Sequence, residues 1–462
     1  MNDQGRKLWA WLGIVLAVAI LARASLWFAY PIAQGNDTPT YLHLASSLKN
    51  NHGFERYNGT RTPGYPIFLM LAGNTDRVYL LQLCLGVLNT FMVYYIAWRV
   101  SQRAWFAGLL ALIHTLNLGQ IFFEAAMLSE TVATFFLLII LTGLVYILKN
   151  QATADTQIPP APIAARNQPD PVRVLVVSLL IGLAAAALAL TRPLFAFFPF
   201  FGAFFLFFFW RPVPIKLRLS AAILTTLPAL LVLLVWINFI YSRFNIIGLD
   251  SIGGYHLVNH TSSFFELAPD EYAPIRATFL QFREQHIART GSPINTIWDA
   301  IPSLMLQTKL NYYSLGRVMG KISTRLISEH PWLYLQNLAR GWYWFWKVGV
   351  FWLPDTLSNS SLRSLVNNIM LVERACLFGI NLLFLSGSLA LLWQKFRRWF
   401  GLDLFTWFAL SAIWVTSILQ TLAEHGDNPR FLAPLQTLVV LVTASWLINI
   451  WAHFSPPKKE QY

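Results

Sequence analysis

Charged residues are scarce in this chain. Only 12% of its 462 residues are Asp, Glu, Lys or Arg, whereas ordinary soluble domains carry roughly 25%. Hydrophobic residues make up 56% of the chain, and the mean hydropathy is +0.50. This composition excludes a soluble globular protein and predicts a chain that crosses a membrane many times.

Cysteine and familiar catalytic motifs are also scarce. The two cysteines, Cys84 and Cys376, lie in apolar runs and indicate no disulfide framework. No HExxH, CxxC, P-loop or GxSxG motif is present, which excludes zinc proteases, NTPases and serine hydrolases of those types. No cleavable signal peptide is indicated, because the first apolar run is long and lacks an Ala-x-Ala site. We therefore expect that run to remain as a span.

Long apolar runs dominate what is present. A spanning helix needs about 20 mostly apolar residues. Runs of this kind lie near 8–30, 78–98, 105–123, 127–148, 174–190, 193–210, 219–241, 368–393, 404–422 and 431–453. The sequence thus predicts an all-α polytopic integral membrane protein with about 10 spanning helices, or about 13 at most if short or re-entrant pieces also enter the bilayer.

The basic residues predict the orientation of these helices. They gather at alternate ends of the runs, at Arg6 with Lys7, Arg99 with Arg103, Lys149 to Arg173, Arg211 to Arg218, Lys395 to Arg398, and Lys458 with Lys459. The positive-inside rule places all six clusters, and both termini, in the cytoplasm. This placement accounts for the net charge of +13, so we expect no nucleic-acid partner. Within this pattern, Gln151–Pro171 is typical of a flexible cytoplasmic linker.

Three regions follow from this topology. Residues 1–241 form an N-terminal transmembrane module with an outer loop at 31–77, and residues 368–462 form a C-terminal one. Between them, residues 242–367 have room for an outward-facing, mainly helical domain, called the outer domain below. In it, Pro302–Ile327 is amphipathic and predicts a helix, and Glu329-His330-Pro331 predicts a break before another helix.

The outer loop carries the most informative acid. Asn36-Asp37-Thr38-Pro39 is typical of a helix start. Apolar positions then recur at helical spacing, at Tyr41, Leu44, Ala45 and Leu48. Asp37 has two compatible interpretations. It caps this helix, or it is a general base at the outer membrane surface, facing a substrate that the lipid presents.

Four arginines break the positive-inside pattern. Arg61, Arg77, Arg192 and Arg430 all fall on the outer side, at the ends of spans or in short loops. A guanidinium group suits phosphate because its planar donors bind two oxygens at once. The alternatives are pairing with local acids or with lipid headgroups, and Arg77 has the position of an ordinary interfacial anchor.

Further candidates lie inside or at the ends of the spans. Arg23 is about 10 Å below the outer end of the first span, where it either snorkels to the surface or meets an anionic group in the bundle. Glu124 and Glu130 flank an outer turn. They are either ordinary first-turn carboxylates or ligands of a substrate or metal ion.

The remaining candidates surround these groups. His256 begins the outer domain, where it either lines a pocket or lies in a solvated loop. Tyr65 belongs to the stretch Arg61-Thr62-Pro63-Gly64-Tyr65-Pro66 at the end of the outer loop. The last three, Glu424, His425 and Asp427, come shortly before Arg430 and the final span.

Taken in order, these motifs resemble the GT-C class of membrane glycosyltransferases, in particular the lipid-A aminoarabinose transferases, the protein O-mannosyltransferases and related bacterial sugar transferases. The class has an acid in the first outer loop, then an amphipathic helix and an Arg-x-Pro-Gly-Tyr-Pro-like stretch. Asp37 and Arg61–Pro66 match these features. Thr191-Arg192-Pro193 is similar to its mid-chain Thr-Arg-Pro, and 424–434 is loosely similar to its late Glu-x-Arg region. Many relatives have an Asp-Glu pair where this chain has Asp37-Thr38, so the role of the second acid is vacant here or falls to Glu124 or Glu130.

The resemblance implies an activity. The donor would be a sugar on a polyprenyl phosphate, and the acceptor a hydroxyl of a lipid, glycan or protein at the outer face of a bacterial cytoplasmic membrane. Asp37 would deprotonate the acceptor, which attacks with inversion, and Arg61, Arg192 and Arg430 would hold the phosphate. No cofactor follows with certainty, and a divalent metal ion is an open alternative. The competing function is a lipid or polysaccharide transporter or flippase.

Overall fold

The structure, a computed structural model, describes residues 3–50, 53–55, 57–149, 170–211, 213–357, 359–425 and 429–454. Across these ranges the regular structure is helical, and the sole extended pairing is an isolated bridge between Ala33 and Ala126. The predicted all-α class is confirmed. Of the predicted linker, residues 151–169 lie outside the described residues.

Eight segments of the described chain are long and apolar enough to cross a membrane. They are α1 (Asp3–Ala29), α4 (Thr75–Ser101), α7 (Glu130–Lys149), α8 (Pro171–Thr191), α10 (Ile215–Phe244), α16 (Ser360–Ala390), α18 (Leu404–Ala423) and Arg430–Phe454, which contains α19 (Ala433–Phe454). This number is lower than the ten expected from the apolar runs.

Two of the expected spans account for the difference. The run at 105–123 is broken into α5 (Ala104–Leu116) and α6 (Leu118–Glu124), which meet at an angle of 54° and give a ninth span only if counted together. The break has a local cause, because the Asn117 side chain accepts a hydrogen bond from the Gln120 backbone N–H and starts a new helix. The run at 193–210 forms only the short apolar helix Pro193–Phe208. No further spans beyond these occur in the described ranges.

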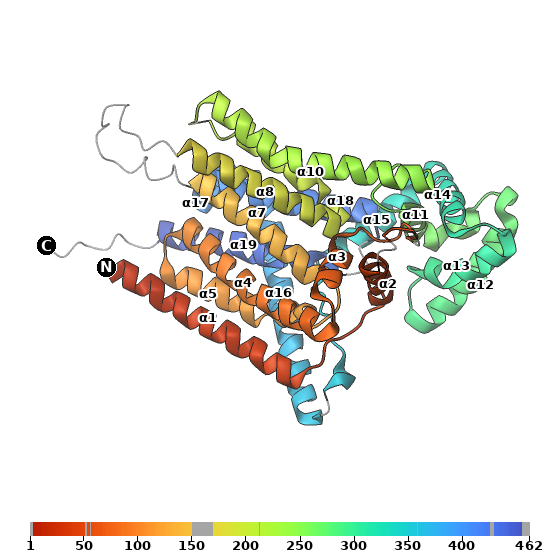
Figure 1. Cartoon of the computed structure of the whole chain (residues 1–462), viewed down its shortest axis with the longest axis horizontal. Helices are drawn as coiled ribbons and strands as arrows, with labels where there is room; N and C mark the ends of the chain where they lie inside the picture. The colour runs from red at the N-terminus through yellow and green to blue at the C-terminus, as the bar shows by residue number, and fades with distance from the viewer. Residues whose placement is uncertain are drawn as a thin grey trace.

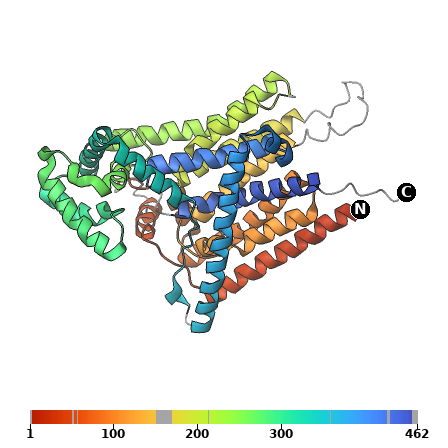
Figure 2. The ribbon, with the colours of Figure 1, turned by 180° about the vertical axis from the view of Figure 1, so that it is seen from behind.

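The long helices are arranged with a clear polarity. The start of α1 and the end of α19 lie at one end of the molecule, and the helices of the outer domain lie at the opposite end (Figures 1 and 2). In both views α16 crosses the neighbouring long helices at a steep angle. The site described below lies at the end occupied by the outer domain.

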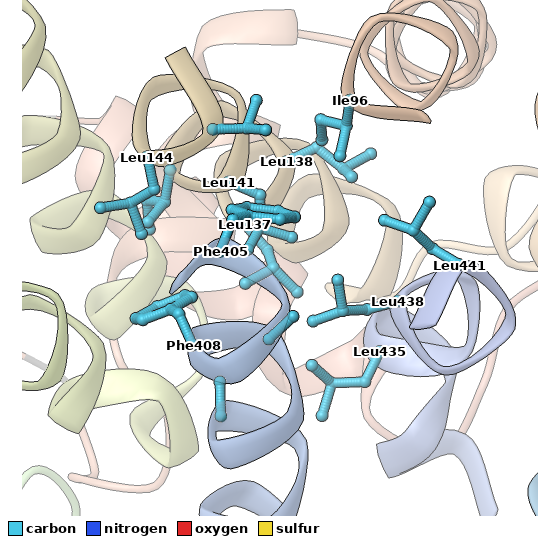
Figure 3. Packing of buried hydrophobic residues seen from close by; sticks show 14 of the residues in the cluster. Ile96, Leu137, Leu138, Leu141, Leu144, Phe405, Phe408, Leu435, Leu438 and Leu441 are labelled. Atoms are coloured by element: carbon cyan, nitrogen blue, oxygen red, sulfur yellow. The ribbon is translucent and has the colours of Figure 1, made fainter. Parts of the chain in front are cut away.

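The two transmembrane regions share one core. Leu137, Leu141 and Leu144 of α7 pack against Phe405 and Phe408 of α18, and leucines of α19 close the same cluster (Figure 3). Burial of such side chains contributes about 1.5–3 kcal/mol each in water, whereas inside a bilayer close packing takes over this role. The late helices α18 and α19 are thereby held directly against α7.

The outer domain is helical, as predicted. It contains α11 (Gly253–Thr261), α12 (Ala273–Thr290), α13 (Thr296–Thr308), α14 (Tyr312–Glu329) and α15 (Pro331–Phe345). The single helix expected at 302–327 is wrong, because the chain turns at Lys309 with φ of +55° and restarts where Asn311 caps α14. The break before Pro331 is confirmed, since α15 begins there.

The outer loop is tied to the transmembrane helices at two places. The Ala33 backbone N–H donates to Ala125 O at 2.7 Å, and the Met127 N–H donates to Ala33 O at 2.8 Å. Farther on, Gly64 begins α3 (Gly64–Ala72), where a Cβ atom would lie 2.6 Å from backbone atoms of Leu190 at the end of α8. Glycine therefore permits the contact that brings this loop beside Arg192.

Candidate functional site

Asp37 stands immediately before α2 (Thr38–Lys49), as predicted. Its side chain makes no capping hydrogen bond, so the capping interpretation of the carboxylate is wrong. Instead, Asp37 Oδ1 accepts a hydrogen bond from Arg61 Nη2 at 2.5 Å, and Oδ2 accepts one from Arg430 Nη2 at 2.6 Å. The apolar face of α2 is confirmed, since Tyr41, Leu44 and Ala45 are buried.

A second carboxylate extends this contact. Glu130 Oε1 lies 2.9 Å from Arg192 Nη2 and 3.4 Å from Arg430 Nε. The result is a chain of ion pairs from Arg61 through Asp37, Arg430 and Glu130 to Arg192, called the arginine cluster below. Three guanidinium groups face two carboxylates in it, so the cluster carries an excess of positive charge and suits an anion.

Aromatic rings support the arginines of this cluster. The guanidinium carbons of Arg192 and Arg430 lie 5.1 Å and 5.6 Å from the ring centroid of Phe431, and that of Arg61 lies 5.1 Å from the ring of Tyr41. These are distances at which a cation is attracted to an aromatic face. The rings therefore hold the arginines in place beside the carboxylates.

The pKa of Asp37 reflects two opposing effects. Burial raises the pKa of this carboxyl, but the charges and hydrogen bonds of Arg430 and Arg61 outweigh burial and lower the pKa below its ordinary value. Asp37 is therefore ionised at neutral pH, with both oxygens occupied by guanidinium groups.

The arginine cluster opens into a large cavity. The cavity has a volume of about 960 Å³ and lies between the ends of the transmembrane helices and the outer domain. Ligand pockets are commonly about 300–1,000 Å³, so this one lies near the upper end. The predicted residues that line it are Asp37, Arg61, Arg192, His256, Glu424 and Arg430. Among them, His256 Nδ1 lies 3.6 Å from Glu424 Oε1, so His256 is a cavity residue and the solvated-loop interpretation is wrong.

Several predicted candidates lie elsewhere. Glu124 forms a buried bidentate ion pair with Arg23, which settles the two interpretations of Arg23 in favour of the bundle interior. Tyr65 is buried behind Tyr41 and donates a hydrogen bond to Gln82 Oε1 at 2.8 Å. Neither Glu124 nor Tyr65 lines the cavity. The neighbouring acid that Thr38 leaves vacant is therefore not supplied by Glu124.

Two candidates near the last span have separate outcomes. His425 is buried against His260, with ring centroids 5.8 Å apart, and burial lowers the pKa of His425 to about 4. It is not among the residues that line the cavity. Asp427 lies outside the described residues. In the rest of the described chain, no group of three or more His, Cys, Asp or Glu side chains is placed to hold a metal ion.

The chain is similar in fold to a protein of known structure. The archaeal oligosaccharyltransferase AglB from Archaeoglobus fulgidus, in complex with an inhibitory peptide and a dolichol-phosphate, is 13% identical and superposes with a TM-score of 0.50 over 96% of this chain. The chain has a GT-C fold. The fold resemblance expected from the sequence motifs is thus confirmed.

The extent of the match is limited. This chain spans about half the length of that protein, 50% of it in the match. A second structure is that of an Archaeoglobus fulgidus oligosaccharyltransferase tethered to an acceptor peptide. It is 14% identical, with a TM-score of 0.47, and the match covers 94% of this chain and 49% of that protein's chain. No protein-family model and no curated protein sequence matches the chain.

Within this GT-C fold the cavity contains residues that the motifs did not indicate. Asp250 lines it from the segment that follows α10, and the end of α12 and the start of α13 supply His286, Arg289, Trp298 and Asp299. None of these residues belongs to a motif. They also do not stand out by their charge, because polar residues are expected throughout a solvated domain. Their common position becomes visible only when the outer domain is folded over the arginine cluster.

Proposed function

We propose that this protein is a membrane glycosyltransferase that moves a sugar from a polyprenyl-phosphate donor to an acceptor hydroxyl. The observation that carries the proposal is the arginine cluster, whose three guanidinium groups and one accessible carboxylate line a single cavity beside the transmembrane helices. A lipid phosphate needs this arrangement, since its chain stays in the bilayer while its charged group requires donors at the membrane surface.

The residues of the cluster divide the chemistry between them. In the proposed reaction the acceptor oxygen attacks the anomeric carbon, the bond from that carbon to the phosphate oxygen breaks with inversion, and the phosphate keeps the electron pair. Arg192, Arg430 and Arg61 stabilise the charge on the departing phosphate. Asp37 receives the proton of the acceptor hydroxyl.

The ion pairs of Asp37 bear on this role. A carboxylate held by two guanidinium groups is a weak base, because those charges lower its pKa. The donor phosphate competes for the same guanidinium donors of Arg61 and Arg430. Each donor that turns to the phosphate weakens its hold on Asp37 and raises the basicity of the carboxylate, so the donor prepares the base before the acceptor reacts.

The proposed location is the bacterial cytoplasmic membrane, with the cavity at the outer face and both termini in the cytoplasm. The sequence supports this orientation through its six basic clusters. The fold is consistent with it, because the start of α1 and the end of α19 lie opposite the outer domain (Figure 1). The structure of AglB contains a dolichol-phosphate, a polyprenyl phosphate, which supports a donor of this class for the present chain.

Asp37→Asn is the direct test of the base. The variant is assayed in membranes for sugar transfer from polyprenyl-phosphate donors, and we expect transfer to fall by at least 100-fold. Asp76→Asn is the matched control, since Asp76 is an exposed acid in the first turn of α4 and does not line the cavity. Full transfer by a folded Asp37→Asn protein would contradict the assignment. Repeating the assay with a chelator determines whether a divalent metal ion is required.

Binding separates transfer from transport. Purified protein should bind undecaprenyl phosphate, and Arg192→Ala should weaken that binding at least tenfold. The matched control is Arg77→Ala, because Arg77 is exposed and lies outside the cavity. If the protein in liposomes moves the lipid between leaflets but transfers no sugar, the transporter function is correct instead.

A further inference from the structure

The cavity has a second wall that the proposed reaction does not use. The end of α12, the loop that follows it and the start of α13 contribute this wall, and it is built entirely from the outer domain. It includes His286, Arg289, Asn295, Trp298 and Asp299, together with Thr290 and Ser292. We call it the tryptophan wall.

Trp298 is held in a fixed orientation. Its indole Nε1–H donates to Asn295 Oδ1 at 3.2 Å. Asn295 is itself held by Asn259, whose Oδ1 accepts from the Asn295 backbone N–H at 3.1 Å and whose Nδ2 donates to Asn295 Oδ1 at 3.3 Å. Tyr255 and His256 contact the indole with ring centroids 5.9 Å and 5.8 Å away. The side chain nevertheless stays 36% exposed and lines the cavity.

Beside Trp298 lies a balanced polar group. Asp299 Oδ2 is 2.6 Å from Arg289 Nη2 and 2.7 Å from His286 Nδ1. One carboxylate thus faces one guanidinium group, in contrast to the arginine cluster, where guanidinium groups outnumber carboxylates. A second phosphate would gain little from such a wall. A neutral ligand with many hydroxyl groups would find both donors and acceptors in it.

The tryptophan wall therefore combines a fixed aromatic face with planar hydrogen-bonding groups. A sugar ring has the complementary surface, with C–H groups on one face and hydroxyl groups around its edge. We propose that the tryptophan wall is a sugar-binding subsite. The sugar ring lies against the indole of Trp298, and the sugar hydroxyl groups form hydrogen bonds with Asp299, Arg289 and Asn295. This inference rests on the proposed function only in assigning the sugar to a glycosyl-transfer reaction.

The cavity is large enough for the sugar at Trp298 to belong either to the donor or to the acceptor. At about 960 Å³ it has room for a donor head group and a further sugar. The sugar at Trp298 is either the one carried by the donor or a unit of a glycan acceptor. Both have the same chemistry, and binding measurements distinguish them.

The experiment uses the purified full-length protein and two kinds of probe. One is a panel of hexose, pentose and N-acetylhexosamine disaccharides, with binding measured by saturation-transfer NMR. The other is undecaprenyl phosphate with and without a linked hexose, measured by competition. The variants are Trp298→Ala and Asp299→Asn. Trp332→Ala is the matched control, because Trp332 is 68% exposed and does not line the cavity.

We expect Trp298→Ala to weaken sugar binding at least tenfold and to leave undecaprenyl phosphate binding unchanged. Loss of disaccharide binding assigns the subsite to the acceptor, and loss of the affinity added by the linked hexose assigns it to the donor. Trp298→Phe should keep most of the binding, and the loss of binding in Asp299→Asn carries the test if thermal unfolding shows that the alanine variant does not fold.

Two results would overturn the subsite. One is that the wild-type protein binds neither a disaccharide nor the linked hexose, and the other is that folded Trp298→Ala and Asp299→Asn variants bind them as the wild type does. A different result would overturn the proposed function alone. In that case sugar binding depends on Trp298, while the wild-type protein has no affinity for undecaprenyl phosphate.

Discussion

Two groups of buried arginines and carboxylates in this protein have the same chemistry but different surroundings. Arg23 and Glu124 form a bidentate pair between α1 and α6, with atoms 2.6 Å and 2.9 Å apart and side chains only 4% and 3% exposed. In the arginine cluster the side chains of Asp37, Arg61 and Arg430 are 16–25% exposed and line the cavity. The first group is sealed, whereas the second is open around Asp37 and is closed only at its far end, where Glu130 and Arg192 are 2% and 8% exposed.

This difference shows what separates a structural ion pair from a binding site. The guanidinium group of Arg23 gives its hydrogen bonds to Glu124 and to Thr115, all of them protein groups. The arginines of the cluster also face carboxylates, but their side chains border a cavity that a ligand can enter. Charged side chains inside a membrane protein suggest function, and access to the cavity decides which of them a ligand can reach.

The largest loss of stability is expected when one partner of the sealed pair is removed. Glu124→Ala leaves the Arg23 charge buried and uncompensated, which we expect to lower the free energy of unfolding by about 3–5 kcal/mol. Unfolding in mixed detergent micelles measures this loss. Asp37→Ala, in the open cluster, should cost much less, because water and ligands reach its arginines. Equal losses for the two variants would remove the distinction between sealed and open groups.

A smaller perturbation of the sealed pair comes from its packing. Gly86 of α4 faces the Glu124 carboxylate so closely that a Cβ atom would overlap it. We expect Gly86→Ala to displace the pair and to destabilise the protein by about 1–3 kcal/mol, measured in the same micelles. Gly13→Ala in α1 is the control, since a Cβ atom there meets nothing within 4 Å. It should be neutral or stabilising, and a neutral Gly86→Ala variant would mean that the pair is loosely held.

The smallest expected effect concerns a carboxylate of the cavity that has no ion-pair partner among the described residues. Burial raises the pKa of Asp250, Glu424 adds to this, and His256 and Arg61 act against it. The folded state therefore binds the proton more tightly than the unfolded state. The stability from this proton is complete below pH of about 4 and is lost as pH rises through the folded pKa.

Asp250→Asn removes the loss of stability that follows when Asp250 gives up its proton at rising pH. The variant should be more stable than the wild type at pH 7 by about 1 kcal/mol, and the difference should shrink toward pH 4. Thermal unfolding across this range measures it. A variant that is less stable at pH 7 would show that the negative charge of Asp250 is itself stabilising. Unlike Glu124, this acid can remain without an arginine because it lies in the open cavity.

Local sequence predicted a large part of the site. Asp37, Arg61, Arg192 and Arg430 were indicated because each is a charged residue at the end of an apolar run or in an outer loop between two such runs, which can be read along the chain. Their convergence was not visible in the same way, since Arg430 and Asp37 meet across 393 residues of chain. The number of spans was overestimated for a related reason. Hydropathy does not register that Asn117 caps a new helix within an apolar run.

The amino-acid sequence alone establishes the helical class, the alternation of basic clusters and the presence of charges at one set of helix ends, because the bilayer imposes these features segment by segment. Folding in three dimensions pairs Glu124 with Arg23 and Glu130 with Arg192, and it brings Trp298 of the outer domain to the same cavity as Asp37. These pairings depend on packing between distant helices, where space and charge are matched only after the chain has folded.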